Sequence, residues 1–412
     1  MWCPSHFSAY PERVRTPAYG AVQPGTDLGV HARALRRVHD AVLGGSSPHV
    51  PPRPLVARSW SRVMLLGLDP SRANARDPLG RAEVERRRRG SPLSLVIDDI
   101  RSVLGSVADA SRFITVVTDL DGVILWREGS ARVLVQADAL GFSEGATWTE
   151  DHVGTNAIGT ALAEAAPVQL FSAEHFEEGQ IPWYCTAAPL HDPRTGALLG
   201  VVDVSGPALT LHPAITALVE TAAKLAEAQL WRRHQERLER LRRSAEHVLA
   251  TTAGPLLLVD EHGWVAHHTG VAARDRIAVP DPHRALAVPG LGLCLPERLA
   301  DGWLVRPAPA AQTMTATLDL RTDEAVLEVS SADGRWRSPL SPRHAAILDH
   351  LHRAGRSGLS AAQLSRAIFG DEAHQVTVRA EVSRLRRTVG ALVATAPYRI
   401  SAELTFEVLR DR

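Results

Sequence analysis

Lysine is almost absent from this chain of 412 residues, in which Lys224 stands against forty-five arginines. Cysteine is equally scarce, because Cys3, Cys185 and Cys294 are odd in number and too far apart for a disulfide framework or a paired-cysteine metal site. The apolar runs are too short to span a bilayer, and residues 1–16 lack the pattern of a signal peptide. We therefore expect a cytoplasmic protein without a membrane span, and we attribute the arginine excess to genomic base composition.

The motifs of common catalytic sites are missing as well. The sequence contains no GxSxG, HExxH or GxGxxG in a suitable context, and no GxxxxGK[ST] phosphate loop. His175 and Cys185 are metal-binding residue types, but no third ligand has a helpful spacing. We therefore predict that the protein is not an enzyme and that it holds no metal or cofactor.

The most informative segment present runs from Val376 to Gly390. Its apolar residues recur at intervals of four, three and four, which places them on one face of a helix: Val378, Val382, Leu385 and Val389. The opposite face and its flanks carry Ala380, Arg379, Ser383, Arg384, Arg386 and Arg387. Arginine forks onto guanine or phosphate, so this helix suits a major groove, although a solvated charged face is the simpler interpretation. Gly390 is placed for a left-handed C-terminal cap.

The neighbouring elements favour the nucleic-acid interpretation. Ser341 and Pro342 begin one helix, Ser360 caps a second over residues 361–369, and Gly370 ends it. Residues 316–320 and 325–329 predict two strands, a turn follows at 333–334, and 391–407 suits a strand pair. From residue 335 onward there are thirteen arginines and seven acidic residues, although the whole chain has a net charge of zero. A basic third helix between strands and a hairpin is the order of a winged helix.

The amino-acid sequence of residues 313–412 also resembles the effector domain of OmpR-type response regulators. The resemblance rests on 340–342, on the run 382–387, and on Tyr398, Arg399 and Ile400. It implies contacts with a double-stranded DNA operator through Arg379, Ser383, Arg384, Arg386, Arg387, Tyr398 and Arg399. Residues 394–397 replace the glycine-rich wing tip of that family, so the resemblance does not extend to its minor-groove contact.

Residues 91–230 have the opposite charge, with eighteen acidic residues against six basic ones. Strands at 113–118 and 123–126 around a turn at 119–122, a strand at 198–204 and an amphipathic helix at 213–230 predict an α+β sheet with helices packed on one side. The basic run 86–89 before this region is interpreted as a solvated helix end or linker, with a second nucleic-acid contact as the alternative.

The run from Gly154 to Leu162 is distinctive, and with the blocks 174–176, 183–189 and 200–206 it resembles the GAF sensor of acetoin-regulator-type sigma-54 activators. The ATPase module of those activators is missing, so the resemblance implies only the sensor. It implies a small-molecule effector in a concave, largely apolar pocket. The candidate ligand-binding residues are Trp148, Thr155, Asn156, Trp183, Cys185 and Asp203. For the two tryptophans, core packing is the alternative.

The remaining segments connect these two regions. Residues 251–310 begin with a hairpin that resembles the start of a PAS-like sheet, but they are too proline-rich and short for a whole one. On the helix over about 213–250, Trp231, Leu238 and Ala245 repeat every seven residues, as do His234, Leu241 and Val248, which predicts a homodimeric coiled coil. The alternative is a helix that lies back on its own domain.

We therefore expect an α+β multidomain chain with a GAF-type sensor, a helical linker and a C-terminal winged helix-turn-helix. The expected segments are a mostly disordered tail (1–54) with a short helix near residues 30–42, a helical lead-in (55–90), the sensor (91–230), a linker helix (231–250), a small PAS-like or irregular β segment (251–312) and the winged helix (313–412). The expected function is a one-component transcriptional regulator in which an effector controls operator binding. The alternative is a signalling module whose winged helix contacts protein.

Overall fold

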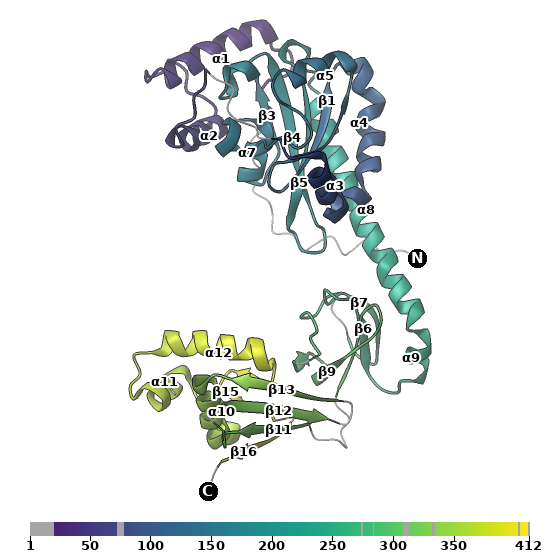
Figure 1. The fold of residues 1–412 in the computed structure, drawn as a ribbon, viewed down its shortest axis with the longest axis vertical. Coiled ribbons are helices and arrows are strands. Elements are labelled where there is room, and N and C mark those ends of the chain that lie inside the picture. The colour runs from purple at the N-terminus through teal and green to yellow at the C-terminus, as the bar shows by residue number, and fades with distance from the viewer. Residues whose placement is uncertain are drawn as a thin grey trace. The chain divides into compact units, whose positions relative to one another are not determined.

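The structure is a computed structural model that describes residues 20–71, 78–272, 275–282, 284–307, 314–322, 324–331, 334–402 and 404–410. The chain divides into two compact units, Met1–Arg233 and His234–Arg412. Both units combine sheets with helices, which makes the fold mixed α and β (Figure 1). Within the described ranges, no helix has both the length and the apolar character that crossing a bilayer requires.

A five-stranded antiparallel sheet forms the centre of the N-terminal unit, in the order β2-β1-β5-β4-β3. Its strands are β1 (Ile114–Asp119), β2 (Ile124–Gly129), β3 (Val168–Phe171), β4 (Trp183–His191) and β5 (Leu198–Pro207). The chain reverses between β1 and β2 at Gly122, whose φ of 74° suits glycine. The hairpin and the later strand that the sequence predicts are both confirmed.

Helices cover both faces of this sheet (Figure 1), so the expectation of helices on one side is wrong. Neighbouring side chains of a strand point to opposite faces, and Val201 and Val202 of β5 accordingly belong to different hydrophobic clusters. The cluster of Val202 includes residues of α4 (Ile97–Ser111) and α8 (Ile215–Ser244); that of Val201 includes residues of α2 (Pro54–Leu65), α5 (Ala131–Asp138) and α7 (Ala157–Glu164). Residues 198–204 are apolar at nearly every position, which is typical of a strand buried on both faces.

Short helical elements complete the connections of this unit. They are α3 (Arg81–Gly90), η1 (Pro92–Leu95), α6 (Glu150–Val153), η2 (Ser172–Glu174), η3 (Glu178–Gln180) and η4 (Ala208–Thr210). In α3, Arg87 pairs with Asp119 at 2.6 Å and Arg88 donates to the carbonyl of Leu125 at 2.7 Å. Two arginines of the basic run therefore hold α3 against the sensor sheet.

The helix predicted near residues 30–42 is present as α1 (Leu28–Leu43), and it packs against the sensor together with Ala21, so the described part of residues 1–54 is more ordered than the prediction of a mostly disordered tail. Residues 1–19 lie outside the described part. Asp27 caps α1 by accepting a hydrogen bond from Val30 N at 2.9 Å. From α1 the buried His39 donates through Nε2 to the carbonyl of Phe176 at 3.1 Å. The N-terminal segment is therefore a layer of the sensor unit.

The second half of α8 packs on strands of its own chain, which corrects the basis of the coiled-coil prediction. The heptad spacing predicts an intermolecular seam, but its residues His234, Leu238, Leu241 and Ala245 are buried within the chain. Leu241 and Ala245 share a cluster with Leu258 of β6 (Leu256–Val259). After a short break the chain continues as α9 (Glu246–Thr251). The second half of α8 thus packs within the C-terminal unit of its own chain.

The middle segment forms a complete five-stranded antiparallel sheet in the order β7-β6-β10-β9-β8. Its further strands are β7 (Val265–Thr269), β8 (Leu286–Val288), β9 (Gly292–Arg298) and β10 (Trp303–Pro307). The order is second, first, fifth, fourth, third, as in the sensor sheet. The segment is therefore long enough for a whole sheet, contrary to our expectation, because its strands are only three to seven residues long.

The C-terminal domain joins a four-stranded sheet to three helices. The sheet has the order β13-β12-β11-β16, with β11 (Met314–Asp319), β12 (Ala325–Ser331), β13 (Gly334–Leu340) and β16 (Leu404–Leu409). The helices are α10 (Pro342–Ala354), α11 (Ala361–Phe369) and α12 (Gln375–Val389), with η5 (Gly355–Ser357) after α10 and the hairpin β14 (Val393–Thr395) and β15 (Tyr398–Ile400) after α12. The strands at 316–320 and 325–329 and the three helices agree with the prediction. The turn placed at 333–334 falls partly outside the described residues.

Two strands of this domain were not anticipated. β13 contains Pro339, which a sheet accommodates because β13 is an edge strand and needs no N–H on its outer side. β16 pairs in parallel with β11, from Met314 opposite Leu404 to Asp319 opposite Leu409. The strand pair predicted over residues 391–407 is therefore only the short β14–β15 hairpin, and the following strand joins the sheet.

Candidate functional site

Helix α12 has an apolar seam that is fully covered by the C-terminal core. Val378, Val382, Leu385 and Val389 are each at most 2% exposed and share one cluster with Leu348 of α10 and Leu364 of α11. The seam fixes the rotation of the helix about its own axis. The residues predicted on the opposite face and its flanks must therefore point away from this core.

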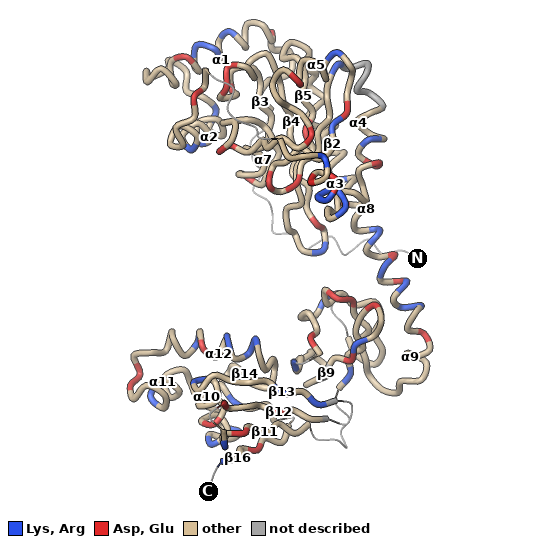
Figure 2. Tube along the Cα trace, in the orientation of Figure 1, with Lys and Arg blue, Asp and Glu red and all other residues tan. Residues whose placement is uncertain are grey.

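The predicted basic residues do lie on the outside of α12, where Figure 2 shows arginine along the helix. Arg379, Ser383, Arg384, Arg386 and Arg387 are all exposed. Arg384 forms an ion pair with Glu381 at 2.5 Å. Among the residues that the structure describes, Arg379, Arg386 and Arg387 have no carboxylate partner. Three of the four guanidinium groups are thus unneutralised and accessible to an anion.

The hairpin residues differ from those of α12. Tyr398 is half-buried against the C-terminal core, and its backbone exchanges hydrogen bonds with Leu359 at 2.8 and 3.0 Å. Arg399 is half-buried as well. Tyr398 therefore contributes to packing, and the structure does not give these two residues the exposure of the α12 arginines.

Two of the six candidate effector residues belong to a structural polar network in the sensor. Asn156 caps α7 by accepting from Gly159 N at 2.9 Å, and its amide donates to Gly154 O at 2.9 Å. Thr155 is fully buried, with its hydroxyl 2.7 Å from the hydroxyl of Ser59 in α2. Their side chains are occupied in joining helices to one another.

Thr155 and Ser59 belong to a polar network centred on Glu150, a residue that no sequence motif indicated. Its carboxylate accepts from Ser59 at 2.5 Å and from Thr160 at 2.8 Å, and it pairs with Arg62 through two hydrogen bonds of 2.8 and 2.9 Å. A two-pronged arginine–carboxylate pair is among the stronger polar contacts in proteins. This pair holds α2 against the rest of the sensor. It joins residues far apart in the sequence, so no local motif predicts it.

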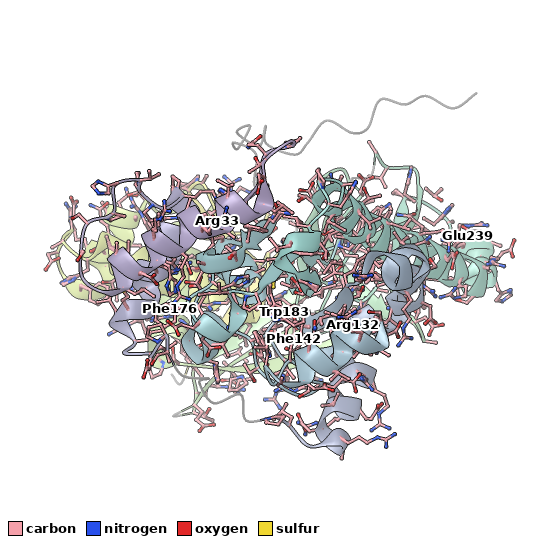
Figure 3. All side chains as sticks on the ribbon, turned by 90° about the horizontal axis from the view of Figure 1, so that it is seen from above. Arg33, Arg132, Phe142, Phe176, Trp183 and Glu239 are labelled. Atoms are coloured by element: carbon pink, nitrogen blue, oxygen red, sulfur yellow. The ribbon has the colours of Figure 1, made fainter. Side chains whose placement is uncertain are left out.

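The other four candidates are on the face of the sheet that α2, α5 and α7 cover. Cys185 of β4 is opposite Ser205 of β5, and Trp183 and Asp203 lie two positions along their strands on the same face. Trp148 belongs to the same cluster as Trp183. Trp148 and Phe142 pack edge to face, with ring centroids 4.5 Å apart. Phe142, Phe176 and Trp183 of this cluster are labelled in Figure 3. Both tryptophans are buried, so they take part in the core whether or not they also meet an effector.

Asp203 is the unusual member of this group. It is 0% exposed, and its Oδ2 accepts a hydrogen bond of 2.6 Å from Ser205. Its Oδ1 has no hydrogen-bond partner among the described residues. Burial raises the pKa of the Asp203 carboxyl to about 7, and the Ser205 hydrogen bond opposes this shift. Burial also raises the pKa of the neighbouring Cys185 thiol well above its ordinary value.

A cavity of about 540 Å³ lies elsewhere on the sensor, and no sequence motif indicates it. It is lined by the segment 20–28 together with Gln169, Leu211, Pro213, Thr216 and Glu220. The buried Gln169 accepts from Ala21 N and donates to Thr216, at 2.9 Å each. These bonds hold the N-terminal segment along the edge strand β3.

Comparison with known proteins shows the family of the chain. An uncharacterized 47.3 kDa protein encoded in the thcA 5′ region of Rhodococcus erythropolis is 30% identical over 398 residues, which cover 94% of this chain and 74% of that protein. The chain belongs to the family of that protein. In addition, residues 55–229 match the model of the MimR N-terminal domain.

Other relatives match a part of their length only. The acetoin dehydrogenase operon transcriptional activator AcoR of Bacillus subtilis is 31% identical, over 56% of this chain and 37% of its own length. The propane 2-monooxygenase operon transcriptional activator MimR of Mycolicibacterium smegmatis is 28% identical, over 42% of this chain and 29% of its own length. Both matches are shorter than two thirds of the relative. Both relatives are named as transcriptional activators, and neither name is that of an enzyme.

Proposed function

We propose that the protein is a transcriptional regulator that couples an N-terminal sensor to a C-terminal DNA-binding domain of the winged-helix type. Its relatives with functional names are transcriptional activators and regulatory proteins, which supports regulation of transcription by a protein with an N-terminal sensor domain. The observation that supports DNA binding most directly is α12. Its seam is buried while Arg379, Arg386 and Arg387 are exposed and lack carboxylate partners among the described residues.

The chemistry of this surface fits double-stranded DNA. Guanidinium groups bind phosphate and guanine in a two-pronged geometry, and the Ser383 hydroxyl suits either. Each phosphate contact releases counterions, so affinity falls with salt at a slope of roughly 0.9 for each contact. The alternative is that the C-terminal domain binds a protein partner. In that case the salt dependence of affinity would not change by a fixed amount for each arginine removed.

The test is binding of the intact protein to its genomic DNA fragments at several salt concentrations. We compare the wild type with the double variant Arg379→Ala and Arg387→Ala. A matched control, Arg335→Ala with Arg337→Ala, removes the same charge from β13, where both arginines contact Glu328. We expect the salt slope to fall by about two units in the first variant only. Equal behaviour of both variants, or no DNA binding by the wild type, would overturn the proposal.

For the sensor we propose a small-molecule effector on the face that carries Trp148, Trp183, Cys185 and Asp203. Asp203 supports this location because a buried carboxylate oxygen without a partner is costly, and a hydrogen-bond donor on a ligand would satisfy it. An effector present at a hundredfold its dissociation constant stabilises the folded sensor by about 2.7 kcal/mol. The test is a thermal-shift screen of metabolites on the intact protein. If no metabolite raises the melting temperature, the result counts against the site.

A homodimer on a two-fold symmetric operator also belongs to the proposal, since two DNA-binding heads on half-sites multiply affinity. Because α8 buries its seam in its own chain, the dimer must use another surface. Sedimentation of the intact protein at micromolar concentration measures this directly, and a monomer would remove the dimer from the proposal.

A further inference from the structure

The middle sheet is joined to the C-terminal end of α12 through backbone contacts. Ala285, just before β8, forms a parallel bridge with Gly390, the residue that follows α12. The amide of Ala391 donates to the carbonyl of Ala285 at 2.9 Å. Ala285 is 2% exposed and belongs to the C-terminal hydrophobic cluster, as does Leu293 of β9. The two parts of this unit are therefore packed together at the end of the proposed DNA-binding helix.

Gly390 makes this close approach sterically feasible. Its φ is 63° and its ψ is −134°, so φ is positive as we expected, but ψ lies outside the left-handed helical region of a usual cap. A Cβ atom at this position would lie 2.1 Å from the Ala285 carbonyl oxygen and 2.5 Å from Cγ of Arg284. The side chain of Arg284 passes over the space that glycine leaves open.

Arg284 ends at the last turn of α12. Its Nη1 donates to the carbonyl oxygen of Arg387 at 3.1 Å, which satisfies one of the carbonyls that a helix end leaves free. Its Nη2 has one further bond, to the carbonyl of Val279 at 3.5 Å. A guanidinium has five N–H donors, so several remain available. Within the described ranges, no carboxylate pairs with Arg284.

We propose that Arg284 is a phosphate-binding residue of the DNA surface, supplied by the middle sheet to the end of α12. This rests on the proposed function of α12. The backbone of Arg387 brings Arg284 to the helix turn that also carries the unpaired Arg386 and Arg387. A helix C-terminus has a partial negative charge of about half an elementary charge, which is smaller than the positive charge of these three arginines. The site therefore favours an anion on balance.

A DNA phosphate is the anion that fits this place. Arg284 is anchored to the backbone of the helix end, so it is suited to the sugar–phosphate chain, whose contacts fix the register of a protein on DNA without reading sequence. The contact would make the middle sheet a direct participant in DNA binding.

The experiment measures DNA affinity of the intact protein against salt for Arg284→Gln, Arg284→Lys and the control Arg298→Gln. Glutamine keeps an N–H donor for the Arg387 carbonyl but has no charge, and lysine keeps the charge. Arg298 lies on the same sheet, where it pairs with Glu261 at 2.8 Å. We expect Arg284→Gln to lower the slope by about one unit and affinity by roughly tenfold near 0.1 M salt. The lysine variant and the control should keep the slope of the wild type.

The outcomes separate the two proposals. If Arg284→Gln weakens binding without a change in slope, Arg284 only positions α12 and the phosphate contact is wrong. Unchanged affinity and slope would also overturn it. If the wild-type protein does not bind DNA at all, the function proposed for α12 is refuted instead. Melting temperatures of all variants identify any that unfold. If Arg284→Gln unfolds, a salt slope of Arg284→Lys below that of the wild type would still overturn the proposal.

Discussion

Asp203 combines full burial with a carboxylate oxygen that no described residue satisfies. An ionised carboxylate in such a place is costly, so without a ligand the folded state holds the proton of this group up to about pH 7. Ser205 supplies one hydrogen bond, which is too little to keep the carboxylate ionised at its ordinary pKa. The stability of the sensor should therefore depend on pH through this residue.

We predict that Asp203→Asn stabilises the effector-free protein relative to the wild type as pH rises from about 4 to about 7. Burial raises the pKa of Asp203 to about 7 in the folded state, against 3.8 as the ordinary value. Between these values the folded state binds more protons than the unfolded chain, so the free energy of unfolding of the wild type falls as pH rises. The difference between the proteins should change by at most about 1.4 kcal/mol per pH unit.

Urea denaturation of both proteins at pH 5, 6 and 7 measures this difference. His175 has the opposite effect, because burial lowers its pKa from 6.5 to about 4 in the folded state. Between these values the unfolded chain binds a proton that the folded state does not, so the free energy of unfolding falls as pH falls. Both proteins contain His175, so its contribution cancels in the comparison. A difference that stays constant with pH would show that Asp203 is ionised in the folded protein.

The helices of the C-terminal domain were predictable because their signals are local. Ser341 accepts from His344 N and begins α10, while Ser360 and Gln363 form a capping box at the start of α11. Gly370 ends α11 with a φ of 89°. The seam of α12 was predictable from its spacing alone. Each of these features depends on residues within a few positions of one another.

The elements that were missed depend on distant partners. β16 becomes a strand of the main sheet through parallel pairing with β11, and a parallel pairing leaves no turn signal in the sequence. β13 was hidden by Pro339, whose tolerance follows from an edge position that only the assembled sheet defines. At the candidate sites, the α12 arginines were found because they share one helix. The Glu150–Arg62 pair and the Arg284 contact were missed because they join segments 88 and 103 residues apart.

The packing of α8 provides a prediction for a single element. Leu241 is 3% exposed, and a Cβ atom at Gly302 would lie 2.8 Å from its Cδ2 atom, so the helix and the strand connection are in close contact. We expect Leu241→Ala to lower the free energy of unfolding by about 2–5 kcal/mol through the cavity it leaves. The association state should not change, because the side chain is buried within one chain.

Urea denaturation and sedimentation of the intact protein check both statements. Gln235→Ala is the control, since Gln235 is exposed on the same helix and its loss should leave stability nearly unchanged. If Leu241→Ala instead dissociates an oligomer, the seam of α8 lies between two chains, and the coiled-coil prediction from the heptad spacing is restored.

Over the whole molecule, charge is divided between regions although the net charge is zero. Residues 91–230 carry eighteen acidic against six basic side chains, and residues 335–412 carry seven acidic against thirteen arginines. An acidic sensor is repelled by nucleic acid, so the basic region alone should supply the electrostatic part of DNA binding. The net charge of the whole chain does not reveal this separation of acidic and basic regions. Only the charge counts of the separate regions indicate a DNA partner.

The division into two units leads to the last prediction, which concerns cooperativity. The sensor core contains Leu170 of β3 and the C-terminal core contains Leu348 of α10, each 0% exposed and in a different cluster. Since each unit has its own core, we expect calorimetry of the intact protein to show two transitions. Leu348→Ala should cost about 3 kcal/mol and lower one transition by roughly 6–12 °C, while Leu170→Ala should lower the other. The double variant should show both shifts independently, because the sites share no partners. A single transition that both substitutions lower would mean that the units unfold as one cooperative body.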